Sequence, residues 1–458
     1  MQVTIDSKSR IVSTYRQKTP GSAQLFAEAK NLFPSGITHD ARYLDPYGIY
    51  VERAVGPHKW DVDGNRYIDY FGGHGALLLG HNHPRVMKAV HESLDRGTHF
   101  GANHALEVRW ADAVRRLIPG AERVRFTSSG TEATLMAVRL ARAFTGKNKI
   151  IRIKSHFHGW NDHMSSGYIS HFDGSATAGV LNQVAENVLL LSPRRVEELG
   201  DLLGRDHDVA ALLLEPTGSL FGKIPLLPES LMAIREITRQ HDVLLILDEV
   251  VTGFRVSPGG AQALYGVTGD LTTLAKILAG GLPGGAVVGR KEILDRLDFE
   301  AARHAGYEKI HHAGTFNANP VSAAAGVAAL ELIATTDACA RANASGTRLR
   351  ELLNEVLEEE KVSWAVYGDF SAFHIFTDPN HRGTPPSEFD PFEVDFRELI
   401  TNPPGVAAKL RLAMLIHGVD IAGWPGGSCS AVHSQEDLEQ TAQAFRESIR
   451  MLKREGVL

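Results

Sequence analysis

Three uninterrupted aliphatic runs constrain the fold of this chain more than any other feature. KIIRI occupies 149–153, VAALLLEP occupies 209–216 and DVLLILDE occupies 242–249, and amphipathic segments separate them. Strands without polar alternation are typical of sheets that are covered on both faces. Between about residues 75 and 325 the pattern therefore predicts an α/β fold with a mostly parallel, doubly wound sheet. Sites in such sheets lie at the carboxyl ends of the strands.

The chain has 458 residues, which is enough for more than one domain. Residues 1–74 combine a helical pattern with a turn-rich stretch, and we expect an N-terminal arm and segment there. Residues 75–325 are expected to form the large domain. The helical and short strand-like patterns of residues 326–458 predict a smaller α+β domain. Within it, residues 377–406 are rich in proline and polar residues and predict a long loop.

Composition and charge argue against several classes of partner. Lysine and arginine total 48 against 54 acidic residues, giving a net charge of -6, so no basic surface for nucleic acid is expected. Cys339 and Cys429 provide neither a disulfide framework nor a four-thiolate metal site. The sequence shows no secretory signal and no apolar window of about 18 residues, so we expect a cytoplasmic protein without a membrane partner.

A turn of small residues after a strand pattern is the first candidate site. In FTSSGTEATLMAVRLARAFTG, residues 126–146, Ser129, Gly130 and Thr131 precede a helical pattern that stops at Gly146. The free N–H groups and positive dipole end of such a helix suit a phosphate. An ordinary helix cap is the alternative interpretation.

Charged residues beside apolar runs are the other two candidates. Asp248 and Glu249 follow LLIL, where a buried acid usually has a cationic partner. A magnesium-nucleotide site would require a G-x-x-x-x-G-K-[ST] loop, which the sequence lacks. Lys276 lies in DLTTLAKILAGG, and we expect it in a loop with a lowered pKa that makes it nucleophilic. A structural ion-pair lysine is the alternative.

Together, a phosphate cradle, a buried acid and an activated lysine match the requirements of pyridoxal 5′-phosphate. The order of these motifs, from Phe33 to the C-terminus, resembles the class-III aminotransferases of fold type I. The resemblance is strongest to the glutamate-1-semialdehyde aminomutase-like branch, which has counterparts of WDVDGNRYIDYFGGHGALLLGH, RFTSSGTEA, FHGW, LDEVVTGFR, DLTTLAK, GGLPGGAVVG and GTFNANP. YFGGHGA, HALEVRWAD and SGYISHFDG also resemble D-phenylglycine aminotransferases.

The resemblance implies a role for each matching residue. Lys276 and Asp248 are the implied catalytic residues: the lysine would bind the cofactor as a Schiff base and the aspartate would hold the pyridine nitrogen. Thr315 would reach the phosphate of a neighbouring subunit, which implies a homodimer with shared active sites. The implied cofactor-binding residues are Ser129, Gly130 and Thr131 at the phosphate, Phe157 above and Val250 beneath the ring, Glu215 near the 3′-oxygen, and Asp248, Lys276 and Thr315.

Arg42 and His74 are the candidate substrate-binding residues. Arg42 lies at the spacing of the aminomutase-like arginine that binds a substrate carboxylate, and a guanidinium can clamp a carboxylate or phosphonate through two hydrogen bonds. The alternative is a surface arginine in a polar loop. His74, Phe157 and Trp160 are candidates for an aromatic-tolerant pocket, with core packing as the alternative.

Three departures from the family pattern argue against aminomutase activity itself. Phe157 replaces a tyrosine found in many members, and His74 replaces the tryptophan of aminomutases. DIAGWPGGSCSAVH, residues 420–433, also lacks a pocket glutamate. The paired histidines lack the spacing of a zinc site, and no metal is expected.

The predicted activity is pyridoxal-phosphate-dependent transfer of an amino group between an amino acid and a 2-keto acid. Aryl, D- and β-amino acids are the candidate donors. One alternative keeps the cofactor but eliminates ammonia or phosphate from a β-hydroxy or β-phospho amine, such as a hydroxy-aminophosphonate. The other is a nucleotide- or metal-binding protein built on Asp248 and the histidine pairs.

Overall fold

A computed structural model describes residues 9–458 and divides the chain into two compact units. We call Pro84–Cys339 the contiguous unit. The composite unit joins Met1–His83 with Ala340–Leu458. Each unit has its own sheets and hydrophobic core, and each is described separately below.

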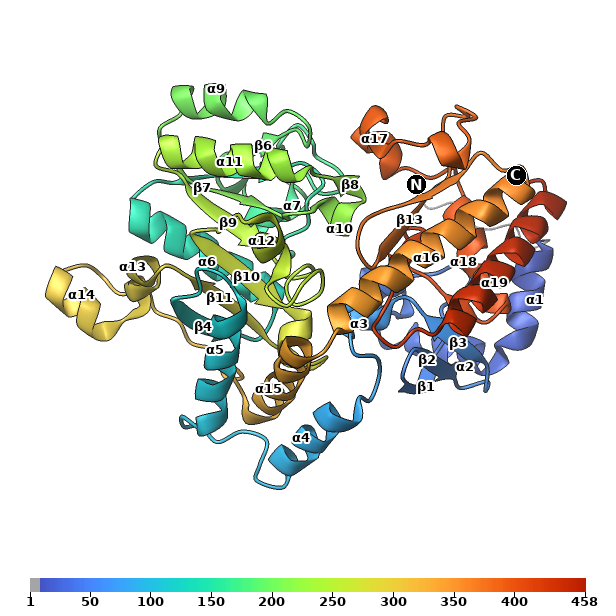
Figure 1. The fold of residues 1–458 in the computed structure, drawn as a ribbon, viewed down its shortest axis with the longest axis horizontal. Coiled ribbons are helices and arrows are strands. Elements are labelled where there is room, and N and C mark those ends of the chain that lie inside the picture. The colour runs from blue at the N-terminus through green and yellow to red at the C-terminus, as the bar shows by residue number, and fades with distance from the viewer. Residues whose placement is uncertain (1–8) are drawn as a thin grey trace. The chain divides into compact units, whose positions relative to one another are not determined.

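The contiguous unit is built on a seven-stranded sheet (Figure 1). Its spatial order is β4 (Arg123–Thr127), β11 (Gly285–Gly289), β10 (Leu271–Ala275), β9 (Leu244–Asp248), β7 (Val209–Leu214), β5 (Lys149–Ile153) and β6 (Val188–Leu191). The last five strands of this order are parallel, and β11 is antiparallel to both of its neighbours. The prediction of a mostly parallel sheet is confirmed.

Helices cover both faces of this sheet, which explains the aliphatic runs. On one face, α6 (Gly130–Thr145) and α13 (Lys291–Leu294) pack through residues such as Leu140 on strand residues such as Ile246. On the other, α9 (Glu197–Arg205) and α11 (Pro228–Gln240) pack through residues such as Ile234 on Leu212 and Leu245. A strand enclosed in this way has no solvent face on which polar residues could alternate.

Three helices form a further layer of the contiguous unit: α4 (Pro84–Leu94), α5 (Ala105–Leu117) and α15 (Pro320–Thr335). The expected boundary at residues 325 and 326 falls inside α15, whereas the contacts end this unit at Cys339. Close packing at Gly326 gives the physical reason. A Cβ on Gly326 would lie 2.4 Å from the indole nitrogen of Trp110, so α15 is seated directly on α5.

The composite unit contains a mixed four-stranded sheet and an antiparallel three-stranded sheet. The first orders β1 (Val51–Val55), β2 (His58–Asp61), β3 (Arg66–Asp69) and β14 (Val419–Asp420), with β14 parallel to β3. The second orders β12 (Ala365–Tyr367), β13 (Ala372–Phe376) and β15 (Gly426–Ser428). The helices are α1 (Arg10–Lys18), α2 (Pro20–Ala29), α16 (Ala338–Glu359), α18 (Val406–Ile416) and α19 (Gln435–Arg454).

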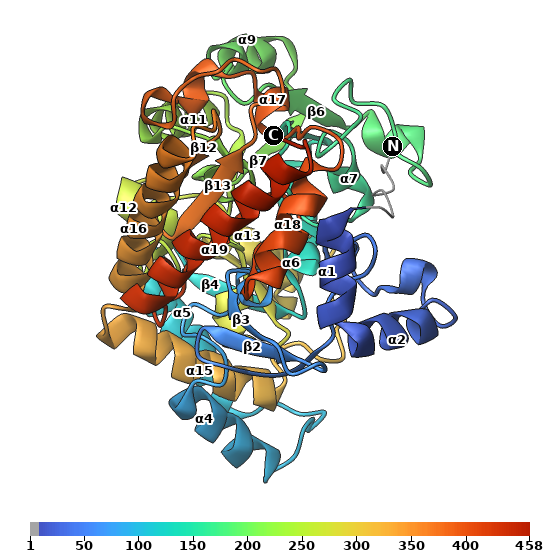
Figure 2. The same cartoon turned by 90° about the vertical axis from the view of Figure 1, so that its right-hand side faces the viewer.

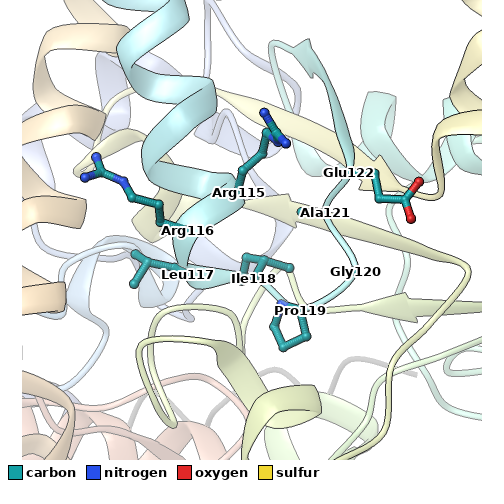
Figure 3. Close-up of a pocket in the computed structure, with 8 residues that line it drawn as sticks. All are labelled: Arg115, Arg116, Leu117, Ile118, Pro119, Gly120, Ala121 and Glu122. Carbon is teal, nitrogen blue, oxygen red and sulfur yellow. The ribbon is translucent and has the colours of Figure 1, made fainter.

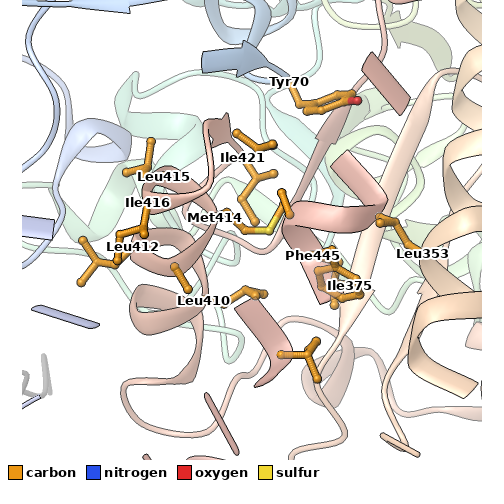
Figure 4. Close-up of a cluster of buried hydrophobic side chains, with 14 of the residues drawn as sticks. Tyr70, Leu353, Ile375, Leu410, Leu412, Met414, Leu415, Ile416, Ile421 and Phe445 are labelled. Carbon is orange, nitrogen blue, oxygen red and sulfur yellow. The ribbon is translucent and has the colours of Figure 1, made fainter. Parts of the chain in front are cut away.

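The N-terminal segment differs from the arm that the sequence led us to expect. Ile11, Val12 and Tyr15 of α1 are buried in the same core as α18 and α19, and α18 lies between the other two helices (Figure 2). Figure 4 shows part of this core, including Phe445 and Met414. The reason is that β3 pairs with β14, so early and late parts of the chain complete one sheet.

The remaining elements are short. They are the helices α3 (Gly72–Gly75), α7 (Asp162–Ser165), α8 (Asn182–Ala185), α10 (Ser219–Gly222), α12 (Gly260–Tyr265), α14 (Phe299–Ala305) and α17 (Phe396–Leu399), the strand β8 (Ile224–Pro225), and the 3-10 turns η1 (Pro34–Gly36), η2 (Asp40–Arg42), η3 (Lys276–Ala279), η4 (Asp295–Leu297), η5 (Pro386–Glu388) and η6 (Pro391–Glu393). The predicted loop at 377–406 contains only η5, η6 and α17. Within residues 9–458, no single helix has the length and apolarity to cross a membrane, and only the bent pair α15 and α16 meets those criteria jointly.

Candidate active site

The predicted cofactor residues of the contiguous unit gather at one edge of its sheet. Ser129 follows β4, the loop 154–161 follows β5, Glu215 follows β7, Asp248 ends β9 and Lys276 follows β10. β4 runs in the same direction as β10, because β11 is antiparallel to both. All five segments therefore leave the sheet at its carboxyl edge, where sites in α/β folds are found.

Close contacts at glycines bring four sequence motifs together. A Cβ on Gly130 would lie 3.1 Å from both methyl groups of Val250 and 3.4 Å from the Cβ of Ala275. A Cβ on Gly159 would lie 2.5 Å from the hydroxyl oxygen of Thr131. The SGT turn thus lies against the residues that flank Asp248 and Lys276, and FHGW packs on the same turn.

The SGT turn begins helix α6 as the sequence predicts. The Ser129 hydroxyl accepts a hydrogen bond from the Glu132 amide at 3.2 Å, and the Glu132 carboxylate accepts one from the Ser128 amide at 2.7 Å. Gly146 ends the helix with φ 71°. The cap leaves the first N–H groups of a 16-residue helix without intrahelical partners, so capping and phosphate binding are compatible here.

Asp248 is a buried carboxylate, 4% exposed, with three hydrogen-bond donors. Its Oδ1 accepts from the Val250 amide and the Thr273 hydroxyl, both at 3.0 Å. Its Oδ2 lies 2.6 Å from Nδ1 of His158. These three contacts fix the orientation of the carboxylate.

The neighbouring acid, Glu249, has a structural role. Its carboxylate accepts hydrogen bonds from the amides of Ala261 and Gln262 at 2.9 and 2.8 Å, at the beginning of α12. Burial raises its pKa, and bonds from Thr252 and these amides oppose the increase. Glu249 therefore caps a short helix, whereas Asp248 is the acid at the carboxyl edge.

Lys276 is the first residue of η3 and has a left-handed backbone with φ 54°. Its side chain keeps part of its solvent exposure. Desolvation by the surrounding protein lowers its pKa, while the nearby carboxylates of Asp248 and Glu215 oppose that change and Arg255 adds to it. A larger share of neutral amine, the nucleophilic form, is the consequence.

Glu215 is buried, and burial raises its pKa to about 8 despite hydrogen bonds from backbone amides. The Phe157 amide donates to its Oε1 at 2.8 Å, and the amides of Leu220 and Phe221 also donate to the carboxylate. Leu220 and Phe221 both have positive φ, 50° and 59°. Two consecutive left-handed residues are costly, and here they point two N–H groups at one carboxyl.

Arg152 and His158 are functional candidates that the sequence analysis missed. Arg152 is fully buried, and its guanidinium donates to the carbonyl of Ser166 at 2.7 Å and to that of His156 at 3.0 Å. Its charge also acts on Glu215 and Asp248. An arginine inside the aliphatic run KIIRI was the available signal, because a buried cation requires compensating partners.

The aromatic candidates of the contiguous unit lie on its surface. Phe157 is 42% exposed, with its ring centroid 4.8 Å from that of Tyr168, and Trp160 is 82% exposed. Core packing is therefore not the role of Trp160. Thr315 is also exposed, in the segment before α15.

The substrate candidates Arg42 and His74 belong to the composite unit. Arg42 ends η2, is exposed, and donates through Nη1 to the Thr38 hydroxyl at 2.8 Å. His74 has φ 58° in a turn whose three glycines also have positive φ. Its ring centroid lies 4.5 Å from those of both His39 and Phe71. Because His39 immediately precedes η2, the two predicted residues lie on contacting segments.

A surface hollow of about 400 Å³ lies elsewhere in the contiguous unit (Figure 3). It is lined by residues 115–122, from the end of α5 to the beginning of β4. This is the amino edge of the sheet, opposite to Lys276. Across the described range 9–458, no group of three or more His, Cys, Asp or Glu side chains is arranged to hold a metal ion.

Comparison with known proteins places this geometry in a family. The sequence model of the family described as aminotransferase class-III matches residues 40–389. The chain belongs to the class-III aminotransferase family. The predicted fold type and the prediction of a pyridoxal-phosphate-dependent enzyme are thereby confirmed.

Relatives of this class-III aminotransferase carry several names. The glutamate-1-semialdehyde 2,1-aminomutase of Methanothrix thermoacetophila is 37% identical over 443 residues, which cover 95% of this chain and 98% of that protein. An omega-transaminase from Sphaerobacter thermophilus has a TM-score of 0.86 at 31% identity, covering 96% of this chain and 99% of that one. A β-phenylalanine aminotransferase from Variovorax paradoxus has a TM-score of 0.84 at 27% identity, covering 98% of both chains.

The residues at the carboxyl edge fit pyridoxal 5′-phosphate. Gly159 lets the backbone approach the SGT turn where a Cβ would collide, and Gly130 leaves room where a Cβ would be tightly packed against Val250; close backbone approach of this kind suits a phosphate cradle. Asp248 offers a buried, oriented carboxylate, and Lys276 offers a desolvated amine with a lowered pKa. These three groups suit the three parts of the cofactor that the protein has to bind: the phosphate anion, the protonated ring nitrogen and the aldehyde.

Proposed function

We propose that the protein transfers an amino group from an amino acid to a 2-keto acid, with Lys276 and Asp248 as its catalytic residues. The observation that carries this proposal is the convergence of Lys276, Asp248 and the SGT turn at one sheet edge. When bound, pyridoxal 5′-phosphate supplies an aldehyde that takes up amines and a ring that withdraws electrons from the substrate's Cα.

The chain's own residues hold the cofactor and move protons. The N–H groups at Gly130 and Thr131 bind the phosphate at the positive end of α6. Asp248 accepts a hydrogen bond from the protonated pyridine nitrogen. The free amine of Lys276 would take the proton from the substrate's Cα as a general base and, as a general acid, deliver it to the carbon that was the cofactor's aldehyde carbon. Its lowered pKa increases the share of neutral amine that can take part in the first of these steps.

The remaining predicted residues surround this centre in the proposal. Val250 packs beneath the ring and Phe157 above it, and Glu215 lies toward the 3′-oxygen. The close approach of Gly130 to Val250 supports the assignment of Val250. The hydrogen bond from the Phe157 amide to the Glu215 carboxylate shows that these two residues lie side by side, as their assignments require. Phe157 carries no hydroxyl, so it contributes stacking alone.

For the substrate, we propose amino acids with an aryl group, including D- and β-amino acids. Arg42 binds the substrate carboxylate, and His74 lines the side-chain pocket. The exposed guanidinium of Arg42 and the ring contacts of His74 with His39 and Phe71 support these roles. Similarity to the β-phenylalanine aminotransferase and resemblance to D-phenylglycine aminotransferases support the aryl donor.

We also propose a cytoplasmic homodimer in which Thr315 contacts the phosphate bound by the partner subunit. The exposure of Thr315 and of Phe316, at 61%, is consistent with a covered surface in the dimer. Sedimentation of the holoenzyme tests the dimer. A monomer that retains full activity contradicts it.

Borohydride treatment of the holoenzyme followed by peptide mass mapping tests the cofactor site. We expect a pyridoxyl group on Lys276, and a label confined to other lysines contradicts the proposal. The reaction is tested with D- and L-arylglycines, β-phenylalanine and aminophosphonates, each with and without 2-oxoglutarate. Transfer requires the keto acid for repeated turnover. Turnover without it, with release of ammonia or phosphate, indicates the lyase alternative.

The aminomutase relatives suggest one further candidate reaction, in which the amino group moves within a single molecule. The name of these relatives gives glutamate 1-semialdehyde as the substrate, with the amino group moved between its carbons 2 and 1. The substitution of His74 for the tryptophan of aminomutases argues against this reaction, and we expect it to be slow compared with transfer from an aryl donor.

A further inference from the structure

Two histidines without an assigned role hold the turn that carries Thr315. This turn, residues 312–319, precedes α15, and we call it the Thr315 turn. Nε2 of His99 donates a hydrogen bond to the Thr315 carbonyl, and Nε2 of His104 donates one to the Ala318 carbonyl at 2.9 Å. Both histidines lie in the segment that leads into α5, so this segment fastens the turn at two points.

Each of these imidazoles uses both of its nitrogens. Nδ1 of His99 accepts a hydrogen bond from the Gly101 amide at 3.2 Å, and Nδ1 of His104 accepts one from the Glu107 amide at 3.3 Å. A carbonyl only accepts, so the N–H lies on Nε2 in each ring. His104 is also the N-cap of α5. Each ring therefore bridges its own backbone to the Thr315 turn.

A third histidine fastens the beginning of the turn. Arg125, in β4, donates through Nε to Nδ1 of His312 at 2.8 Å and through Nη2 to the His312 carbonyl at 3.2 Å. An arginine only donates, so Nδ1 of His312 is the acceptor and the ring is neutral. Burial lowers the pKa of His312, and the charge of Arg125 adds to the lowering, in agreement with this state. Because β4 leads to the SGT turn, Arg125 ties the Thr315 turn to the strand of the proposed phosphate cradle.

The backbone of the Thr315 turn is strained near its end. Ala318 has φ 52°, in the left-handed region that residues with a Cβ seldom adopt. Such a conformation persists where surrounding contacts fix it, and here His104 binds the Ala318 carbonyl. Ala318 is 8% exposed, whereas Thr315 and Phe316 are exposed. The exposed part of the turn thus lies between two fastened ends.

We infer that His99, His104 and His312 are positioning residues that act through Thr315. They fix the Thr315 turn so that the Thr315 hydroxyl meets the phosphate bound by the partner subunit. The inference rests on the proposed function, in which Thr315 makes that contact. It predicts that the three histidines contribute to the affinity for the cofactor's phosphate and not to that for its ring or its aldehyde.

The experiment measures how tightly the cofactor-free protein binds pyridoxal 5′-phosphate and pyridoxal, which lacks the phosphate. Equilibrium dialysis gives both dissociation constants. We expect Thr315→Val to raise that for pyridoxal 5′-phosphate about 10- to 100-fold, the size of one lost hydrogen bond to a charged group. His312→Leu and His99→Leu should each raise it about 10-fold, and combining either with Thr315→Val should add no further loss. For pyridoxal, each ratio of variant to wild type should stay near one.

Conservative variants separate positioning from packing. His312→Asn keeps an acceptor near the place of Nδ1, so the bond from Arg125 can form and most of the affinity should return. His104→Asn keeps the N-cap, because asparagine accepts from the Glu107 amide, but it does not reach the Ala318 carbonyl, and a loss of about 10-fold is expected. Adding Ala318→Gly should restore part of that loss, since glycine adopts a positive φ without strain.

His163→Leu is the matched control. Nε2 of His163 contacts Arg142, in the last turn of α6, at 2.8 Å, which is the same kind of contact as that of His312 with Arg125 but lies outside the Thr315 turn. Both of its dissociation constants should equal those of wild type. Losses in His312→Leu that are equal for both compounds, or that add to the loss in Thr315→Val, contradict the inference and indicate a packing role.

The outcomes for the proposed function and for the inference are distinct. If Thr315→Val binds pyridoxal 5′-phosphate as wild type does, the proposed contact of Thr315 has failed. If Thr315→Val binds it more weakly but the histidine variants do not, only the inference is overturned. If His312→Leu fails to fold, as judged by circular dichroism, His104→Asn carries the test, and a loss that is equal for both compounds overturns the inference.

Discussion

The two units of this protein each contain a lysine in desolvated surroundings, and the two lysines have opposite pKa shifts. In the composite unit, burial disfavours the charged form of Lys59 and acts to lower its pKa. The carboxylates of Asp420 and Asp69, at 2.6 and 2.7 Å, outweigh this effect, so the pKa of Lys59 is raised. In the contiguous unit, desolvation outweighs the more distant carboxylates around Lys276 and lowers its pKa. Direct pairing accounts for the difference.

The surroundings of the two lysines extend this contrast. Asp69 also binds His81 at 2.7 Å, and Asp420 binds Arg411 at 3.3 Å, so the carboxylates around Lys59 are shared among cations. Around Lys276, Glu215 has a raised pKa and Asp248 is bound by neutral donors and a histidine. The charge-paired surroundings of Lys59 are typical of a structural ion-pair network. The surroundings of Lys276 are typical of a functional site, because they shift pKa values without pairing the lysine directly.

Replacement of Lys276 gives the largest expected effect on activity. Lys276→Ala removes the proton-transfer amine and should lower kcat by at least about 10³-fold. Thermal unfolding should stay close to wild type, because Lys276 forms no ion pair within residues 9–458. Steady-state kinetics and a melting curve of the cofactor-free protein are the measurements. If Lys276→Ala instead lowers the melting temperature strongly and leaves kcat nearly unchanged, Lys276 has a structural role and the contrast with Lys59 is wrong.

Breaking the network around Lys59 should have the opposite pattern. Asp420→Ala leaves Lys59 and Arg411 with fewer counter-charges in a buried region, which should lower the free energy of unfolding by about 3–5 kcal/mol. Urea unfolding measures the loss, and the kcat of the protein that remains folded should change little. An unchanged urea midpoint would show that this network is not a source of stability.

The raised pKa of Glu215 predicts a pH-dependent stability. Its usual pKa is 4.5 and its folded value is about 8, so between these values the folded protein keeps a proton that the unfolded chain releases. Stability from this group is therefore present at low pH and is lost as pH rises through that window. Glu215→Gln removes this loss.

The measurement for Glu215 is the melting temperature of cofactor-free protein at pH 5, 7 and 9. The difference, variant minus wild type, should become more positive with rising pH. Comparing differences cancels the titration of groups that both proteins share. A difference that stays constant with pH contradicts the raised pKa.

A partly exposed ion pair is expected to have the smallest effect. Lys149 and Asp206 lie 2.6 Å apart in the contiguous unit, as close as Lys59 and Asp420, but their side chains are 31% and 21% exposed. Because water and salt reach and screen this pair, Lys149→Ala should lower the urea midpoint much less than Asp420→Ala does. A loss as large as that of Asp420→Ala would mean that distance, rather than burial, sets the value of an ion pair here.

Much of the contiguous unit could be predicted from local sequence. Aliphatic runs predicted the parallel strands, and SGT with Gly146 predicted both ends of α6, because these signals depend on neighbouring residues. Lys276 and Asp248 were found in the same way, as charged residues at the ends of apolar runs. The order of β11 between β4 and β10 was not predictable, since strand order depends on contacts between distant segments.

The missed features depend on distant contacts. The arm expected at residues 1–74 is part of a sheet completed by β14, and nothing in its own sequence names that partner. The expected boundary at 326 lies within α15, where Gly326 contacts Trp110, 216 residues earlier. His158 could not be distinguished from other histidines by sequence, because its role depends on the burial that it shares with Asp248.

The pairing of β3 with β14 also bears on how the chain folds during synthesis. The contiguous unit is an unbroken stretch of chain and can assemble as soon as Cys339 has left the ribosome. The sheet that begins near Val51 must wait for Val419, so its first three strands are translated long before their last neighbour exists. During that interval the edge of β3 that later pairs with β14 lacks its partner and is open to pairing with another chain.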